Sequence, residues 1–390
     1  MVHSFADAES IFTQQDHTPP SRKPSAYVFD SNGDTRIILS TYMAQTIQWE
    51  ADKIWIKQKK PTKTYYRMRN LEKKCKGVRL SPLTALPAPR DCRKATLQVQ
   101  DWDYGETCQP SLEKIEFRML VSGKHLELAS NVFKTMLTGP FIEGSADSSG
   151  LRRITASDWD HRALKIVLAI MHGYHRDVPR SIDFYLLVKV ALIVNYYDCL
   201  ESVEVYTDIW LKDFEHNLPR TYGRDCILYL FLSWVFSKPE MFQRMAHLAM
   251  RHSQKLIEAE DFPIPAVILR EINTVRQFTI SEIFSAIYEL LDRLQDEQEC
   301  SFECSSMLLG ILTKELKRHG ILYPRSAPPY NGFSIDGLQK MIRELKRPSW
   351  YSGPSKHSHH ICDVQVELGL PLAEAEFCMY VFDLQDFQSV

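Results

Sequence analysis

Glycine is scarce in this sequence, and the motifs that bind phosphate or activate a nucleophile are missing. The chain has 15 glycines in 390 residues, whereas proteins average roughly 7%. It contains no Gly-x4-Gly-Lys-Ser/Thr loop, no Gly-x-Gly-x-x-Gly, no Gly-x-Ser-x-Gly and no His-Glu-x-x-His. Isolated acids such as Asp158 and Asp160 are better explained as helix caps than as an acid–base pair. An enzyme is therefore not expected.

The sequence also lacks a long apolar run, a secretory signal and a large net charge. Its longest nearly unbroken apolar run, Cys226 to Phe236, is shorter than the roughly 20 residues of a membrane span, so it predicts a buried helix. The N-terminus shows no basic stretch followed by an apolar one, and the net charge is −2. With no export signal, nine cysteines predict an intracellular protein of the cytoplasm or nucleus with reduced thiols. Metal binding or simple burial is therefore favoured over disulfides.

Residues 121–144 carry the clearest local pattern. Ser130-Asn131 offers a helix N-cap in the middle of an apolar helical stripe, so two short helices in tandem are predicted. Upstream, Ile115–Met119 alternates apolar and polar residues like a half-buried strand. Downstream we expect a strand over 152–156, a helix that ends at His172-Gly173, and helices over about 182–197 and 203–214. The stripe repeats at three- and four-residue spacing and consists of Leu126, Ala129, Phe133, Met136 and Leu137.

This order of elements resembles the BTB/POZ fold. Its members carry a run similar to His125-Leu-x-Leu-Ala-Ser-x-x-Phe-x-x-Met-Leu137, and its fungal members enter their first strand through a pattern similar to Asp30-Ser-Asn-Gly-Asp-Thr-Arg-Ile-Ile-Leu39. The resemblance covers roughly residues 25–40 and 115–214. It implies an α+β BTB/POZ domain over 25–214, a small sheet with helical hairpins. It also implies a non-enzymatic scaffold or adaptor that binds other proteins as a homodimer. The residues around Ser31-Asn-Gly-Asp34 alone predict either two strands about an Asn-Gly turn or one strand entered through a turn.

Residues 41–114 separate the first two expected strands of this domain and are strongly basic. Between Ala51 and Lys94 there are 14 lysines and arginines but three acids, a net +11. Such a block usually forms a solvated, irregular insertion, and lengthening a loop costs little entropy. Its aromatic residues Trp55, Tyr65 and Tyr66 indicate an alternative function, a nuclear regulator that contacts nucleic acid. Residues 1–24 are predicted to be a disordered tail.

Residues 215–390 predict an all-α C-terminal domain. Pro263-Ile-Pro265 opens a long helix, which must pack along most of its extent to be stable. Pro348 follows the last helix that the pattern predicts. The expected helices cover 225–237, 240–251, about 266–295, 307–319 and 333–346.

Cysteines and histidines near the C-terminus suggest a structural zinc site. Cys300 and Cys304 are four residues apart, a spacing that points both sulfurs to one side of a helical turn. His360-x-Cys362 supplies the other two of the four tetrahedral ligands that structural Zn²⁺ prefers. His357 and His359 are alternatives to His360. Related fungal BTB/POZ proteins show similar runs, while the simpler interpretation is buried cysteines without a metal.

Phe141 and Glu143 follow the predicted helix pair. In BTB/POZ proteins that recruit a cullin scaffold, an apolar-x-Glu element occupies this position. The resemblance therefore implies a partner-binding role for Phe141 and Glu143, and a substrate receptor of a cullin-type ubiquitin ligase as a special case of the adaptor. The simpler interpretation is a solvated loop glutamate.

Overall fold

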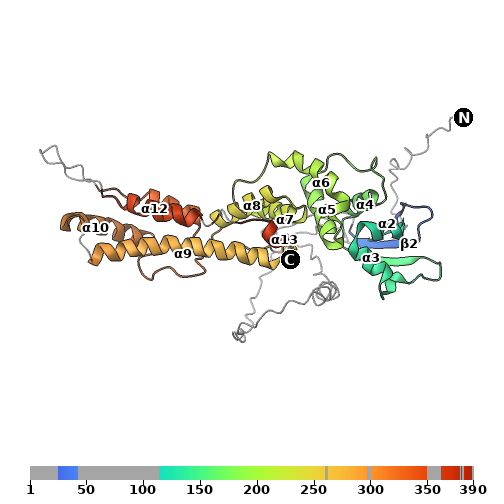
Figure 1. Cartoon of the computed structure of the whole chain (residues 1–390), viewed down its shortest axis with the longest axis horizontal. Coiled ribbons are helices and arrows are strands. Elements are labelled where there is room, and N and C mark those ends of the chain that lie inside the picture. The colour runs from blue at the N-terminus through green and yellow to red at the C-terminus, as the bar shows by residue number, and fades with distance from the viewer. Residues whose placement is uncertain are drawn as a thin grey trace, which may run out of the picture. The chain divides into compact units, whose positions relative to one another are not determined.

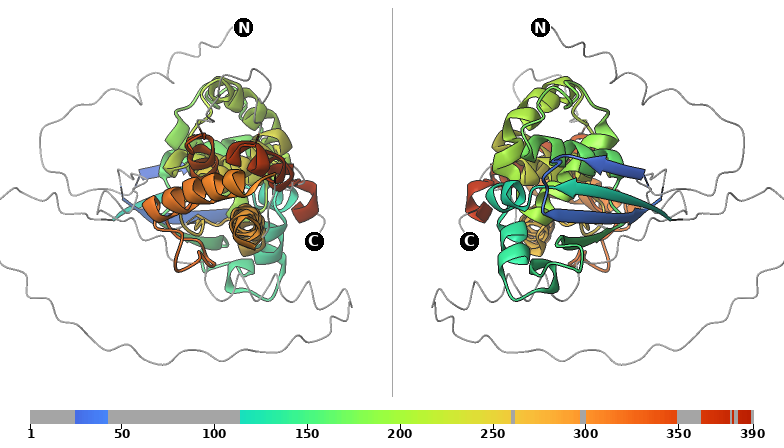
Figure 2. Two further views of the ribbon diagram at one scale, coloured as in Figure 1. Left: turned by 90° about the vertical axis from the view of Figure 1, so that its left-hand side faces the viewer. Right: turned by 90° about the vertical axis from the view of Figure 1, so that its right-hand side faces the viewer.

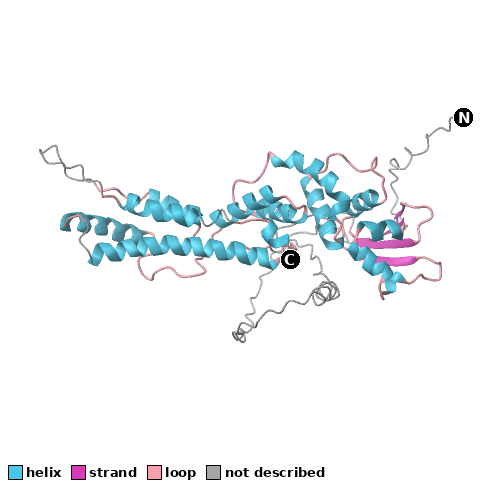
Figure 3. Ribbon diagram, viewed as in Figure 1, coloured by secondary structure: helices cyan, strands magenta, loops and turns pink. Residues whose placement is uncertain are grey.

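The structure, a computed structural model, describes residues 25–42, 114–259, 262–296, 300–348, 362–377, 379 and 382–388. The predicted tail, nearly all of the basic insertion and residues 349–361 lie outside this range. The chain divides into two parts, residues 1–41 with 116–390 and residues 42–115. All helices and strands described below belong to the first part, apart from the first residue of β3. A small sheet combined with many helices (Figure 3) confirms the α+β class at that level.

Four strands form one mixed sheet in the order β1-β3-β2-β4. β1 pairs with β3 and β2 pairs with β4, both in parallel. Strands lie on both sides of the Asn-Gly segment, as one of the two interpretations expected, but β3 lies between β1 and β2, so these two strands do not pair as a hairpin. The alternation expected in β3 is confirmed, since Phe117, Met119 and Val121 are buried. The right-hand view of Figure 2 shows the strands, whose bounds are Ser25–Val28 (β1), Thr35–Thr41 (β2), Ile115–Val121 (β3) and Arg152–Ser157 (β4).

The two short helices expected after β3 are present. α2 (Gly123–Ala129) and α3 (Asn131–Thr138) meet at Ser130, whose hydroxyl oxygen accepts a hydrogen bond from Phe133 N at 3.0 Å. The same hydroxyl donates to the carbonyl oxygen of Tyr197 at 2.5 Å, and the Phe133 and Tyr197 rings stack 4.2 Å apart. Ser130 therefore separates the two helices and also anchors them to the helix that carries Tyr197.

Three helices follow β4, as predicted. Asp160 caps the first of them by accepting hydrogen bonds from Arg162 N and Ala163 N, and it pairs with Lys189 at 2.7 Å. The second helix is apolar on most of its surface because it packs against α3 and against the helices before and after it. The bounds are His161–Met171 (α4), Phe184–Tyr197 (α5) and Leu200–Glu215 (α6).

The C-terminal region is helical wherever regular elements are described. The long helix α9 packs against α8, α10 and α12 (Figure 1) and also against α11, as its length requires. In the described part of the chain, no helix combines the length and apolar character needed to cross a membrane. The bounds are Arg224–Val235 (α7), Pro239–His252 (α8), Ala266–Asp296 (α9), Phe302–Arg318 (α10), Ile335–Arg343 (α11), Val364–Phe377 (α12) and Gln385–Gln388 (α13).

Three C-terminal helices differ from the sequence prediction. α10 begins at Phe302 rather than at residue 307, because Ser301 caps it and accepts a hydrogen bond from Cys304 N at 3.2 Å. α11 covers a shorter range than 333–346, and Ser334 caps its start. α12 was not predicted. Pro371 lies inside it, and an internal proline normally ends a helix. Its packing on α9 offsets that penalty.

Candidate functional site

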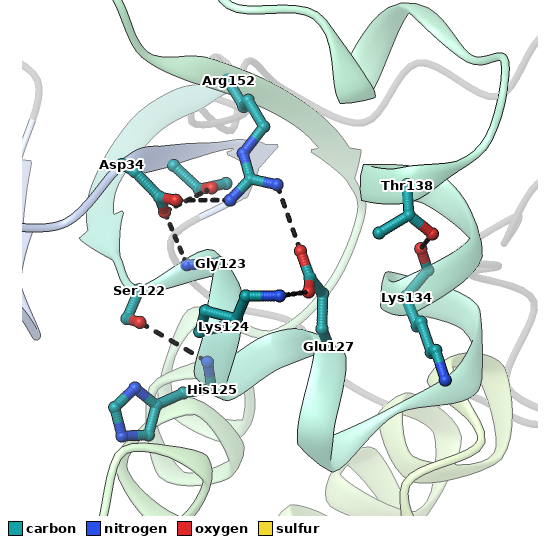
Figure 4. Close-up of polar contacts among 10 residues, drawn as sticks. Asp34, Ser122, Gly123, Lys124, His125, Glu127, Lys134, Thr138 and Arg152 are labelled. Atoms are coloured by element: carbon teal, nitrogen blue, oxygen red, sulfur yellow. Dashed lines mark hydrogen bonds and ion pairs between the residues drawn. The ribbon is translucent and has the colours of Figure 1, made fainter.

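The starts of β2, α2 and β4 meet at a polar junction centred on Asp34 (Figure 4). Asp34 Oδ1 accepts a hydrogen bond from Gly123 N at 2.7 Å, and Oδ2 accepts one from Arg152 Nη2 at 2.5 Å. Arg152 Nη1 also donates to Glu127 Oε1 at 3.2 Å. Lys124 Nζ completes the network at 2.6 Å from Glu127 Oε2. The junction therefore ties together three segments that are far apart in the sequence.

The charges of the junction stabilise both of its carboxylates. Burial by itself would raise the pKa of Asp34, but the hydrogen bond from Gly123 and the interaction with Arg152 bring that pKa below its usual value. The hydrogen bond from Lys124 is the main reason why the pKa of Glu127 is also lowered. Each charged group thus has a group of opposite charge beside it. This is the arrangement of a structural clamp, and it leaves no acid or base poised for proton transfer.

Two glycines allow the segments of the junction to approach so closely. A Cβ atom on Gly33 would lie 2.6 Å from the carbonyl oxygen of Val121, and one on Gly123 would overlap the Arg152 guanidinium. The Gly33 contact is with the backbone of β3, so any other residue there would push the strand away. The Gly123 contact is with the end of the Arg152 side chain, so a Cβ atom there would displace the guanidinium from the junction. The pattern Gly33-Asp34 therefore has a physical reason: the glycine gives close packing and the aspartate gives the clamp.

Phe141 and Glu143, the expected partner-binding residues, flank an exposed isoleucine. Glu143 lies in the 3-10 turn η3 (Ile142–Gly144) and Phe141 precedes it; both are half-buried, whereas Ile142 is 84% exposed. Leu128 in α2 is 86% exposed. Leu128 and Ile142 are the most exposed large apolar side chains in the described residues, and the sequence pattern did not single them out.

His172, at the end of α4, is a half-buried histidine that links α4 to the start of α2. Its Nδ1 donates to the carbonyl oxygen of Leu168 at 2.8 Å, because its Nε2 accepts from Ser122 N at 3.0 Å. The imidazole ring lies 5.5 Å from the Phe29 ring and 5.1 Å from the His125 ring. Burial lowers the pKa of His172 below its usual value. The neutral form is therefore the one that the fold requires.

Acidification through about pH 6.5 is expected to destabilise the protein, because the unfolded chain takes up a proton on His172 at a higher pH than the folded chain does. The free energy of unfolding should fall by at most about 1.4 kcal/mol per pH unit for this proton and level off below the folded-state pKa. Urea unfolding between about pH 7 and 5 measures the slope, since this range brackets the usual histidine pKa. His172→Gln should reduce this slope, while His175→Gln, at an exposed position, should not.

A residual slope in the His172→Gln variant is expected because burial also lowers the pKa values of His161 and His247. Equal slopes for wild type and His172→Gln would contradict the prediction.

Three cysteines come together beside the starts of α10 and α12. The sulfur atoms of Cys300, Cys304 and Cys362 all lie within 4.8 Å of one another. Cys304 is buried in the first turn of α10, Cys362 is half-buried just before α12, and Cys300 is exposed. Burial, followed by the neighbouring thiols, raises the pKa of Cys304 to about 12. The chain thus gathers three soft ligands from segments about 60 residues apart in sequence.

The geometry of the cluster fits three of the four ligands of a thiolate metal site. Zn–S bonds of about 2.3 Å in a tetrahedron place the sulfur atoms roughly 3.8 Å apart, so closing the cluster around a metal requires shifts of about an ångström. The structure therefore brings together the three cysteines that the sequence had suggested as ligands.

The histidines that the sequence suggests as a fourth ligand, His357, His359 and His360, lie outside the described residues. Within the described residues no histidine or carboxylate joins the three sulfurs. His360 therefore stays a sequence prediction, with His357 and His359 as its alternatives.

Comparisons with known proteins add no assignment. The chain matches no family model, no curated protein and no solved structure.

Proposed function

We propose that the chain is a non-enzymatic protein-interaction module, a scaffold or adaptor with a BTB/POZ-type domain over 25–214 and a helical domain over 215–390. The order of elements supports this: the α2–α3 pair lies between β3 and β4, and three helices follow. Residues of the two runs that resemble BTB/POZ proteins also hold the fold together. Gly33 and Asp34 build the junction, and Ser130 separates and anchors the helix pair. An adaptor uses such a scaffold to present side chains to other proteins.

The exposure of Leu128 and Ile142 is the observation that carries the proposal. Their neighbours Leu126, Phe133 and Leu137 are buried, so the helix pair contributes to the core and still leaves two large apolar side chains in solvent. Burying such a side chain stabilises a complex by roughly 1.5–3 kcal/mol. We therefore assign Leu128 and Ile142 to a self-association surface, which makes the chain a homodimer.

The double change Leu128→Glu/Ile142→Glu is expected to convert the dimer into a monomer, because it places two charges in an apolar interface. Sedimentation velocity of the full chain measures this. Val205→Glu is the matched control, since Val205 on α6 is also an exposed apolar residue, and it should leave the dimer intact. Association of wild type should be insensitive to salt. A monomeric wild type, or a dimer that persists in the double variant, would refute the proposed surface.

We further propose that the cysteine cluster holds a structural zinc ion. Cys300, Cys304 and Cys362 would bind it together with one histidine, His360 first among the candidates. Four protein ligands leave no open coordination position, so the ion would add stability rather than catalysis. Its effect would be to fasten the starts of α10 and α12 to each other, and α9 packs against both helices.

Two narrower functions remain predictions from the sequence. Recruitment of a cullin scaffold rests on Phe141 and Glu143, beside the exposed Ile142. A nuclear, nucleic-acid-associated role rests on the basic insertion, which lies almost wholly outside the described residues.

A further inference from the structure

A groove with a volume of about 410 Å³ runs between α9 and α12. The buried side chains of Leu290 on α9 and Leu368 on α12 form its floor, with the small side chains of Ala286 and Ala375 beside them. Phe278, 50% exposed, lies among its lining residues. The small floor residues leave room for apolar side chains of a ligand.

Glutamates line the groove from both helices. Glu282 and Glu289 belong to α9, and Glu367 and Glu374 belong to α12. In each pair the two residues are seven apart, which is two helical turns or about 10.5 Å. Arg293 is the one cation among the lining residues and pairs with Glu367 at 2.8 Å. The lining therefore has a net charge of −3, with acids repeated at the same helical interval on both walls.

The carboxylates of the α9 wall are available to a ligand. Glu282 and Glu289 are exposed, and within the described residues neither has an ion-pair partner. A cationic ligand would gain two ion pairs there and could keep its apolar atoms on the floor, as lysine and arginine side chains do at such surfaces. Anionic ligands, including nucleic acid and acidic lipid surfaces, would be repelled by the same charges.

We infer that this groove binds a basic amphipathic helix of a partner protein. The lining stretch of α9 from Phe278 to Arg293 is about 22 Å long, which exceeds the length of a small ligand and matches about four turns of a helix. A helix laid along the groove would place an apolar stripe on the floor and lysines or arginines, seven residues apart, beside both walls, as in helix-in-groove recognition. This goes beyond the proposed scaffold function, because it defines the chemistry of a partner, and it depends neither on dimerisation nor on zinc.

Fluorescence anisotropy of the full chain with a labelled helical peptide tests the inference. The probe is a 14-residue peptide of lysine, leucine and alanine, with its leucines on one helical face and lysines seven residues apart. Glu282→Lys/Glu289→Lys should weaken its binding at least tenfold at physiological ionic strength. The matched control is Glu201→Lys/Glu204→Lys, which makes the same charge change at exposed positions of α6 and should bind like wild type. A scrambled peptide of the same composition, without an apolar face, should bind at least tenfold more weakly.

The other outcomes of this experiment overturn the inference. Equal binding of the amphipathic and scrambled peptides would show charge attraction without a groove. Equal loss in the α6 control would show that net charge alone decides binding. If Glu282→Lys/Glu289→Lys instead dissociates a dimer in sedimentation velocity, the occupant is a second copy of this chain.

Discussion

Replacing Cys304 by serine is expected to remove zinc from the purified, untagged protein and to lower its melting temperature by roughly 10 °C. A serine hydroxyl is a far poorer zinc ligand than a thiolate. A metal present at 100 to 1,000 times its dissociation constant stabilises the folded state by about 3–4 kcal/mol. Each kcal/mol shifts the melting temperature of a domain of 150–250 residues by roughly 2–4 °C. Metal analysis and thermal unfolding, with and without a chelator, measure both effects.

Cys226→Ser is the matched control for this experiment. Cys226 is as deeply buried as Cys304 but lies on α7, where its sulfur contacts the carbonyl oxygen of Met245 at 3.4 Å. This variant should lose some stability, retain its zinc and remain sensitive to the chelator. Parallel changes of His357, His359 and His360 to alanine then identify the fourth ligand by the loss of zinc. Wild-type protein that contains no zinc would refute the metal site.

The cysteine cluster shows where sequence reasoning about a site reaches its limit. The spacing of Cys300 and Cys304 is local, and a helical turn dictates that the two sulfurs point the same way. The residues around Cys362 do not show that it lies beside Cys300 and Cys304, because that contact depends on how α10 and α12 pack on α9. The internal Pro371 argues against a helix over residues 364–377, so neither α12 nor the groove between α9 and α12 could be expected from the sequence.

The N-terminal elements were more predictable because their signals are short-range. The N-cap of Ser130 and the alternation in β3 are read directly from neighbouring residues, and both are confirmed. The pairing of β1 with β3 was missed because the long insertion separates the two strands. Neighbouring residues in the sequence do not show which distant strand a strand pairs with. The same holds for the contact of Asp34 with Arg152, which are 118 residues apart.

Arg276→Met is expected to destabilise the protein by about 3–5 kcal/mol, although the side chain is far from every candidate site. Arg276 lies on α9 and is fully buried. Its Nε donates to the carbonyl oxygen of Ser253 at 3.2 Å, just after α8. Its Nη1 and Nη2 donate to three carbonyl oxygens in residues 329–333, at 2.7 to 3.5 Å. Removing these donors leaves four buried acceptors unpaired, at a cost of about 1–3 kcal/mol each, and loss of the buried charge offsets part of that cost. The midpoint of urea unfolding, followed by circular dichroism, measures the loss.

The bridging of carbonyls, rather than the volume of the side chain, explains why an arginine is buried here. Within the described residues no carboxylate pairs with Arg276, and its hydrogen bonds go to backbone carbonyl oxygens. Only a planar guanidinium offers five donors in a fixed fork. Arg276→Lys should therefore lose about 2 kcal/mol, because a compact ammonium cannot reach both Ser253 and the 329–333 segment. Arg270→Met, at an exposed position of the same helix, should change stability by less than about 0.5 kcal/mol. If Arg276→Met cost no more than Arg270→Met, the loop at 329–333 would be held by apolar packing instead.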